Sequence, residues 1–379
     1  MNEQVHIYDA KNINTYPWAD TDEAEIAKRY LVPFISEGVD QFIENVHAKM
    51  ILLRYKELII PVTVNDQFGL SSFVSSPYGQ YVTSASVVSD KIQSSFLRYP
   101  FQWGLNLYGH VMRIGKLDQV VIVNNWLLTT NPYLKLDLEA IEAITTCLKK
   151  LFPCHAIVFR SIVQETCHTS FEALVNHGYR LIPSKQVYVT DATNEEVYKT
   201  RIFKSDLKFI REKNFEVIQA DKIQESDLDR IQELYQSLYI DKYALTNPRY
   251  NKKFIALLVN SKILNIIAIK NENVIEGVAG YLCRQDRMIS PFFGYDPIKS
   301  ENSGLYRYLS VTLLLEAQKH QAQFNQSAGG SFFKKVRRAE PRMEYTAIYE
   351  NHLPFYRRLP WSLLEVLMNR FGKRAMEAY

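Results

Sequence analysis

The sequence predicts an α/β (α+β) protein with two tandem domains, each a mixed central sheet flanked by helices. The first observation behind this prediction is length, because 379 residues exceed what one small core can hold. The second is composition, since 47% hydrophobic and 23% charged residues are the proportions of a globular protein. The third is order, because strand-like and helix-like segments alternate along the chain in two blocks.

The first domain is predicted at residues 48–191, after an N-terminal extension at 1–47. Its helices show apolar residues at helical spacing, and Gly178 is a suitable stop for the second of them. The predicted elements are two paired strands within 49–64, a buried strand at 118–128, a helix at 136–152, a strand at 155–163, a helix at 169–179 and a strand at 180–190.

A basic connecting helix at 192–214 leads to the second domain, predicted at residues 215–350. The first long helix of this domain has one apolar face, formed by Leu228, Ile231 and Tyr235. A C-terminal amphipathic helix is predicted at 351–379. In order, the second domain has a strand at 215–223, helices at 226–243 and 248–261, strands at 262–272, 274–285 and 287–296, a helix at 303–318, a strand and turn at 322–330, a short basic helix at 331–340 and a strand at 343–350.

Charge and cysteine spacing limit the function. A formal net charge of +4 is modest, so the overall balance does not indicate nucleic acid. Cys154 and Cys167 are each followed by a histidine but form no Cys-x-x-Cys pair, so we assign no metal. The first residues do not resemble a secretory signal, and the apolar runs are too short to span a bilayer. We therefore expect a cytoplasmic protein without a transmembrane segment.

The order of elements in residues 215–350 resembles the GNAT, or acyl-CoA N-acyltransferase, fold, and residues 48–191 resemble it more weakly. Two such units in one chain are similar to the Fem-type acyltransferases, which add amino acids to peptidoglycan precursors. The connecting stretch "YKTRIFKSDLKFIREKNFEV" is similar to the basic helix before the second unit of those proteins. The resemblance implies a catalytic second domain and a first domain that helps to form the acceptor cleft.

The stretch "FFGYDPIKSENSGLYRYL" carries the predicted donor site. In GNAT proteins the turn and helix N-terminus at this place hold the pyrophosphate of coenzyme A, because unpaired N–H groups and the helix dipole favour an anion. Of the family's usual pattern the chain keeps only Gly304 cleanly. An acyl group on a carrier-bound phosphopantetheine would need the same groove without the full nucleotide site, and an ordinary strand-to-helix loop is the structural alternative. The predicted donor-binding residues are Ser300, Asn302, Ser303, Gly304, Leu305 and Tyr306.

The predicted catalytic residues follow from the chemistry of amide formation. An amine must be neutral to attack a thioester, so Asp296 at the strand end is a candidate general base. Asp296 could equally begin an Asp-Pro turn. Asn325 matches an asparagine that GNAT proteins often carry after the fifth strand. Tyr295 or Tyr306 would supply any acid that the leaving group needs.

Phe332 and Phe333 stand where GNAT proteins often place a tyrosine acid. Two phenylalanines at this place would suit an apolar acyl chain, with each buried methylene contributing ~0.8 kcal/mol. Plain core packing is the alternative for both residues.

The predicted acceptor site lies in "LYIDKYALTNPRY", where GNAT proteins usually bind the acceptor. A loop this rich in tyrosine and charge is also ordinary surface. The residues proposed for acceptor binding are Tyr239, Lys242, Tyr243, Arg249 and Tyr250.

Basic residues gather in "SFFKKVRRAEPR" and in the C-terminal helix. They could dock an acidic acyl carrier protein or a lipid surface, although such a helix more often packs onto its own domain. These residues are Lys334, Lys335, Arg337, Arg338, Arg342, Arg357, Arg358, Arg370, Lys373 and Arg374.

We therefore expect an N-acyltransferase that moves an acyl group, a fatty one included, from acyl-CoA or an acyl carrier to the amine of a peptide or metabolite. A first alternative is a Fem-type transferase that uses aminoacyl-tRNA, with Lys199, Arg201, Lys204, Lys208 and Arg211 of the connecting helix as tRNA contacts. A second alternative is a non-catalytic module that binds acylated carriers or peptides.

Overall fold

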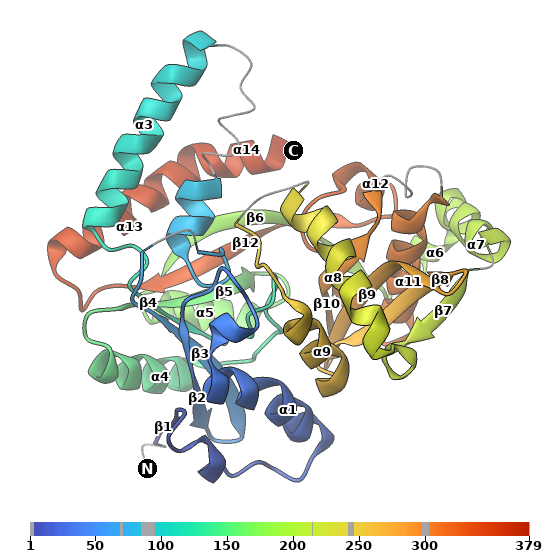
Figure 1. Ribbon diagram of the computed structural model, residues 1–379. Coiled ribbons are helices and arrows are strands. Elements are labelled where there is room, and N and C mark those ends of the chain that lie inside the picture. The colour runs from blue at the N-terminus through green and yellow to red at the C-terminus, as the bar shows by residue number, and fades with distance from the viewer. Residues whose placement is uncertain are drawn as a thin grey trace.

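The structure is a computed structural model that describes residues 4–68, 71–84, 95–213, 215–241, 246–297 and 303–378. Within these ranges the strands form one mixed sheet that runs through the whole molecule (Figure 1). In sheet order the strands are β1 (His6–Tyr8), β2 (Lys49–Tyr55), β3 (Leu58–Asn65), β4 (Val120–Val123), β5 (Ala156–Val163), β12 (Glu340–Tyr349), β6 (Arg180–Asp191), β11 (Gln323–Asn325), β10 (Arg287–Tyr295), β9 (Val274–Arg284), β8 (Asn265–Asn271) and β7 (Glu216–Gln219).

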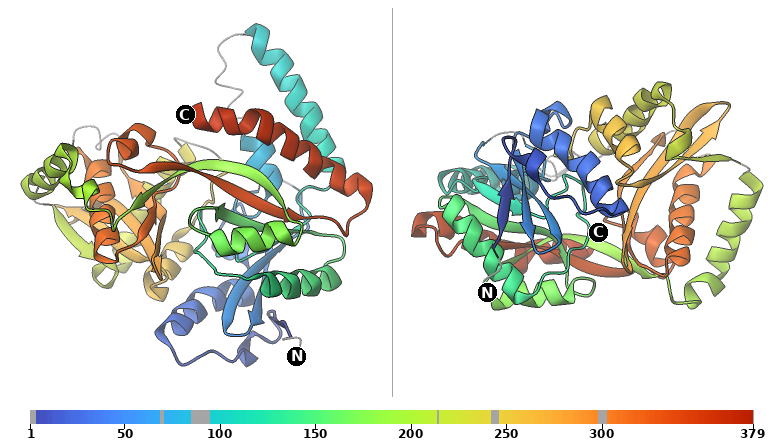
Figure 2. Two further views of the ribbon diagram at one scale, coloured as in Figure 1. Left: turned by 180° about the vertical axis from the view of Figure 1, so that it is seen from behind. Right: turned by 90° about the horizontal axis from the view of Figure 1, so that it is seen from below.

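Helices flank the sheet, as the predicted mixed α/β class requires (Figures 1 and 2). The predicted strand and helix order of both blocks is confirmed, because each expected element has a counterpart in the structure. The sequence analysis predicts no helix at residues 22–37 or 95–114, where the structure has one. The helices are α1 (Asp22–Glu37), α3 (Ser95–Ile114), α4 (Leu138–Leu151), α5 (His168–Asn176), α6 (Glu196–Lys199), α7 (Arg201–Lys213), α8 (Leu228–Gln236), α9 (Lys252–Ser261), α11 (Leu305–Lys319), α12 (Ser331–Lys335), α13 (Phe355–Leu367) and α14 (Lys373–Ala378).

Two long antiparallel strands, β6 and β12, join the blocks. β12 belongs to the second block by sequence, yet it pairs with β5 and β6 of the first block. β6 in turn pairs with β11 of the second block, from Val189 opposite Asn325 to Asp191 opposite Gln323. The blocks therefore share one hydrogen-bonded sheet, and the domain boundaries at 48–191 and 215–350 stay a prediction.

The strands β10 and β11 diverge at the centre of the second block. They pair in parallel only from Arg287–Ile289 to Gln323–Asn325, whereas β10 continues to Tyr295. The register of β10 against β9 also shifts between Ile289 and Phe292, which marks a bulge. Since a bulge bends its strand, β10 bends just beyond the point where its pairing with β11 ends.

Helix α1 lies in the segment that we set outside both domains, and it nevertheless forms part of a shared core. Tyr30 and Phe34 are buried, and the Tyr30 hydroxyl donates to the carbonyl of Trp126 at 2.9 Å. Phe34 also lies 6.3 Å from Phe254 of α9, measured between ring centroids. This core cluster therefore contains side chains from the N-terminal segment, the first block and the second block.

Among the described residues, the helices are all too short or too polar for a bilayer crossing.

Alanine substitutions at Gly304 and Gly329 should separate backbone strain from side-chain crowding. Both glycines have positive φ, 73° and 76°, which costs about 1–2 kcal/mol for a residue with a Cβ. A Cβ at Gly304 would lie 2.5 Å from the Phe209 ring, whereas one at Gly329 meets nothing within 4 Å. We expect Gly304→Ala to lower the free energy of unfolding, measured in urea, by more than Gly329→Ala does. Equal losses would contradict close packing of α7 against α11.

Candidate active site

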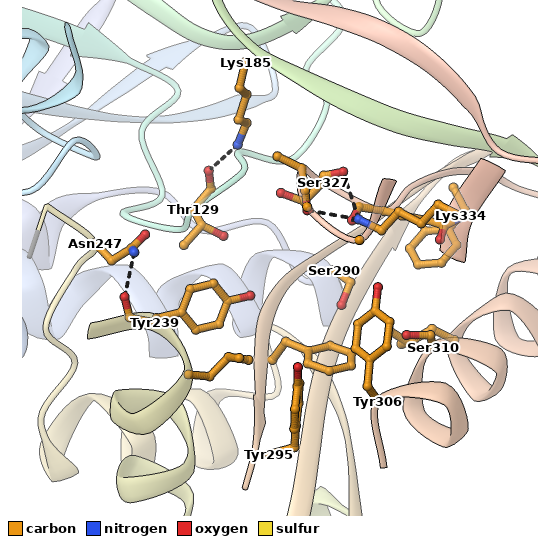
Figure 3. A pocket seen from close by; sticks show the side chains of 18 of the residues that line it. Thr129, Lys185, Tyr239, Asn247, Ser290, Tyr295, Tyr306, Ser310, Ser327 and Lys334 are labelled. Carbon is orange, nitrogen blue, oxygen red and sulfur yellow. Dashed lines mark hydrogen bonds between the residues drawn. The ribbon is translucent and has the colours of Figure 1, made fainter. Parts of the chain in front are cut away.

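A cavity of about 410 Å³ opens where β10 and β11 diverge (Figure 3). Its walls come from both blocks of the chain, because Phe73, Thr129 and Lys185 line it together with residues of the second block. The second-block lining residues are Leu238, Tyr239, Asn247, Ser290, Phe293, Tyr295, Tyr306, Ser310, Leu313, Phe324, Gln326, Ser327, Ala328, Gly329, Gly330 and Lys334. A concave site between two units, with apolar walls and a few polar groups, has the general form of a small-molecule site.

The wall formed by β10 is held in place by two side-chain hydrogen bonds. The Ser290 hydroxyl donates to the carbonyl of Gly280 on β9 at 3.0 Å. From the first block, the buried Thr129 hydroxyl donates to the carbonyl of Pro291 at 2.7 Å. These bonds fix the backbone of the bulge at the point where the cavity begins.

Aromatic rings cover the floor of the cavity. Phe293, Tyr295 and Tyr306 lie with ring centroids 5.9 Å apart in each pair. Tyr239 faces them from the segment after α8, and its carbonyl accepts from the Asn247 amide at 2.8 Å (Figure 3). Such rings supply apolar contact area while their hydroxyl groups stay near the cavity.

Lys334 of α12 is the buried cation of this site. Its ammonium nitrogen donates to the carbonyls of Gln326, Ser327 and Ala328 at 2.7, 3.1 and 3.0 Å. Burial, and then the charge of nearby Lys185, lower the pKa of Lys334 to about 7. The three carbonyl acceptors match the three protons of the charged form, so they oppose this shift.

Lys185 of β6 enters the cavity from another wall and has a carboxylate partner. Its nitrogen lies 3.6 Å from Glu344 of β12 and donates to the carbonyl of Thr129 at 3.3 Å. Burial lowers the pKa of Lys185, while the charge of Glu344 raises it. Lys185 therefore has a carboxylate beside it, whereas the hydrogen bonds of Lys334 go to neutral carbonyls.

The orientation of α12 depends on the fully buried carboxylate of Asp206 on α7. Asp206 accepts two hydrogen bonds from Arg337, at 2.7 and 2.9 Å, and one from Arg307 of α11 at 2.6 Å. Arg337 also donates to the carbonyl of Phe333 at 2.8 Å, directly beside Lys334. This network connects α7, α11 and α12 and so holds the helix that carries Lys334.

Three of the predicted site residues come together in the cavity, namely Tyr239, Tyr295 and Tyr306. Asp296 is outside the described lining, and its carboxylate lies 3.8 Å from the Arg230 guanidinium. The buried Asn325 side chain accepts from the backbone N–H of Ser327 at 2.8 Å, and Asn325 is outside the described lining.

The predicted donor-binding residues are more widely spread. Gly304 begins α11, and the space that its Cβ would fill is taken by Phe209. Ser303 precedes Gly304, and Leu305 is buried in the core behind the first turn of α11. Ser300 and Asn302 lie outside the described residues.

Neither phenylalanine of α12 belongs to the described cavity lining. Phe332 is 79% exposed. Phe333 packs against Tyr306 with ring centroids 4.9 Å apart and lies under the Arg337 guanidinium. Their role in holding an acyl chain stays a prediction.

Of the other predicted acceptor residues, Arg249 and Tyr250 do not line the cavity. The Tyr250 hydroxyl donates to the carbonyl of Leu127 at 2.9 Å, deep in the core. The backbone N–H of Arg249 donates to Asn45 at 2.8 Å. Lys242 and Tyr243 lie outside the described residues.

Sequence reasoning missed Thr129, Lys185 and Ser290, and it placed Lys334 on a basic surface. For Lys185, a signal was present, because a lone lysine in the middle of the apolar strand "RLIPSKQVYVT" needs a reason. For Lys334, the preceding pair Gly329-Gly330 marks a backbone turn whose carbonyls can accept from a following side chain. In the described part of the chain, His, Cys, Asp and Glu form no cluster that could hold a metal ion.

These features define a class of fold: two GNAT-like units arranged in tandem on one sheet, as in the Fem-type proteins. The structure aligns with that of FemX over 93% of this chain and 97% of that chain, with a TM-score of 0.51 and 10% sequence identity. The expected GNAT-like, Fem-type architecture is thereby confirmed as a fold. At this identity the likeness extends to the fold alone.

Two further solved structures resemble parts of the chain more loosely. L-PGS from Bacillus licheniformis has a TM-score of 0.42 and 13% identity, over 61% of this chain and 78% of that chain. A GCN5-related N-acetyltransferase from Kribbella flavida has a TM-score of 0.35 and 8% identity, over 91% and 71%. No protein-family model and no curated protein sequence matches the chain.

Replacing Asp206 by asparagine should destabilise the protein by about 3–5 kcal/mol, because the buried Arg337 would lose its carboxylate partner. Arg307 is a matched control from the same network, since its side chain is 31% exposed and Arg307→Gln leaves the Asp206–Arg337 pair intact. We expect the control to cost about 1 kcal/mol or less. Free energies of unfolding from denaturant titration test this, and equal losses for both variants would contradict the proposed network.

Proposed function

We propose that the chain is an N-acyltransferase that moves an acyl group from a thioester, on coenzyme A or a carrier protein, to the amine of a peptide or small metabolite. The observation that carries this proposal is the cavity between the diverging strands β10 and β11, with a buried lysine at its edge. Backbone N–H groups of β10 beyond its pairing with β11 would be available to a bound carbonyl, which is what acyl transfer needs.

The reaction makes specific demands on the cavity. The neutral amine attacks the donor carbonyl, a C–N bond forms, and the carbonyl oxygen becomes an oxyanion in the tetrahedral intermediate. The C–S bond then breaks, the thiolate leaves, and one amine proton must pass to a base or to the leaving group. Lys334 in its charged form would stabilise the oxyanion through its charge, because a preorganised charge in a dry site acts strongly, and β10 N–H groups would donate the hydrogen bonds.

Proton transfer can be assigned to residues near the reacting carbonyl. Tyr295 and Tyr306 line the cavity and would act as acids toward the leaving group. Asp296 follows Tyr295 directly and remains the candidate base, acting through a water because its side chain is outside the described lining. Tyr239 and Asn247, on the opposite wall, would contact the acceptor.

An aminoacyl ester of tRNA is a second candidate donor, and one observation favours it. Arg201, Lys204, Lys208 and Arg211 are exposed on α7. Their spacing of three, four and three residues places them on one side of the helix. A stripe of positive charge of this kind suits a phosphate backbone. The chemistry in the cavity would be the same, with an ester oxygen as the leaving atom.

Amide formation, followed by mass spectrometry, tests the proposal. Purified protein is incubated with an acyl-CoA series, acylated carrier protein or aminoacyl-tRNA, each with a pool of amine acceptors. Lys334→Met should lower amide formation roughly a hundredfold, on the scale of a lost oxyanion stabiliser. Lys335→Met is the matched control, because it removes the same charge from the exposed side of α12 and should leave the rate unchanged.

The result distinguishes the three hypotheses. Amide from a thioester supports the primary proposal, whereas amide only from aminoacyl-tRNA, lost on reversing the charges of α7, supports the second candidate. Absence of amide with every donor, combined with retained binding of an acylated carrier or peptide, would replace both with a non-catalytic binding module. Equal rates for Lys334→Met and Lys335→Met would remove Lys334 from the mechanism.

A further inference from the structure

Helix α3 carries an apolar face that the rest of the protein does not cover. Trp103, Leu107 and Ile114 are 70, 52 and 61% exposed. Their spacing of four and seven residues places them on one side of the helix. On the other side, Tyr108 and Met112 pack into a core cluster of the first block. The helix is therefore attached by one face and presents a second apolar face outward.

Helix α13 likewise has one apolar face that packs into the core and a second apolar face that is exposed. Phe355, Leu359, Leu363 and Val366 are exposed at spacings of four, four and three residues, whereas Trp361 packs into the core cluster that also holds Met112 of α3. The apolar surface continues beyond α13, since Phe371 in the following turn is 65% exposed.

The two helices meet at the base of α3. Gly115, directly after α3, packs against Pro360 of α13, and Arg357 donates to the carbonyl of Gly115 at 2.8 Å. Figures 1 and 2 show α3 projecting from the body beside the α13–α14 segment. More than half of the large apolar side chains exposed among the described residues belong to these elements, a concentration unusual on a protein surface.

The same segments are strongly basic. Residues 95–116 and 355–378 together contain eight Lys or Arg residues and two Glu residues. One of the two, Glu365, forms an ion pair with Arg180 of β6. Arg113, Arg370 and Arg374 are exposed. An apolar face with positive charge at its edges is the pattern of helices that lie in the headgroup region of a membrane.

We propose that α3 and the α13–α14 segment form a docking surface for an anionic lipid bilayer. Trp103, Leu107 and Phe355 insert among the headgroups. The exposed basic residues Arg113, Arg370 and Arg374 contact lipid phosphates. This inference is independent of the proposed transferase activity, because none of these residues belongs to the described cavity lining.

Charge favours a lipid surface over a second copy of the chain. In a two-fold contact the same basic patch would face itself, and like charges across an interface cost free energy. The projecting form of α3 also suits insertion into a soft layer, since a rigid partner would need a groove to receive it.

Vesicle flotation of the full chain tests the proposal. We expect binding to phosphatidylcholine vesicles that contain 30% phosphatidylglycerol, with at least tenfold weaker binding to phosphatidylcholine alone and to either vesicle in 0.5 M salt. Trp103→Ser combined with Leu107→Ser should weaken binding roughly tenfold. Leu138→Ser combined with Val175→Ser is the matched control, because these exposed apolar residues lie on α4 and α5, and it should bind as the unmodified chain does.

Tryptophan fluorescence gives a second readout of the same contact. Trp126 and Trp361 are buried and Trp18 is partly buried, so Trp103 should dominate any blue shift on anionic vesicles. Trp103→Phe should lose the shift and keep most of the binding. No flotation with anionic vesicles, or equal flotation of the two serine pairs, would overturn the proposal. It would also be overturned by a dimer in sedimentation velocity without lipid that the Trp103 and Leu107 substitutions dissociate.

Discussion

The position of β6 between β12 and β11 is the constraint on which the rest of the molecule depends. β6 pairs with β12 along nearly its whole length and with β11 at its other edge. Because hydrogen-bonded strands keep a fixed spacing, Lys185 on β6 and the loop after β11 are held at a defined distance. Strands of one sheet therefore carry opposite walls of the cavity, and these walls cannot move apart without breaking strand pairs.

Two lysines in one cavity require different kinds of support. Lys185 has the Glu344 carboxylate 3.6 Å away. Lys334 is held by three carbonyls, and its helix is fixed by the Asp206–Arg337 pair. A buried cation balanced mainly by dipoles is costly in the empty site and favourable when negative charge develops nearby. In the proposed mechanism, this difference favours Lys334 over Lys185 as the charge that stabilises the oxyanion.

The sequence predicts most of the order of strands and helices. This is possible because the alternation of apolar residues in strands, and their spacing in helices, involve residues that are close in the sequence. The strand exchange of β6 and β12 was not predictable, since pairing between residues about 160 positions apart leaves no local signal. Tyr295 and Tyr306 can be predicted as site residues because Tyr295 ends a strand and Tyr306 lies in the first turn of the following helix. The basic neighbours of Lys334 predict a surface position for this residue. Its burial depends on the contact between Arg337 and Asp206 of another helix, which the local sequence does not show. Gly304 predicts close approach of the backbone to a phosphate. In the structure, the Phe209 ring occupies the space that a Cβ of this residue would fill.

In the proposed mechanism, the acyl carbonyl binds between the diverging strands β10 and β11, beside Lys334. A crystal structure with a non-hydrolysable donor analogue tests it most directly. We expect the carbonyl oxygen within hydrogen-bond reach of a backbone N–H between Ser290 and Tyr295, with the acyl chain along Phe293 and Leu313. An analogue bound with its carbonyl outside this cavity, in a protein that still transfers the corresponding acyl group, would contradict the claim.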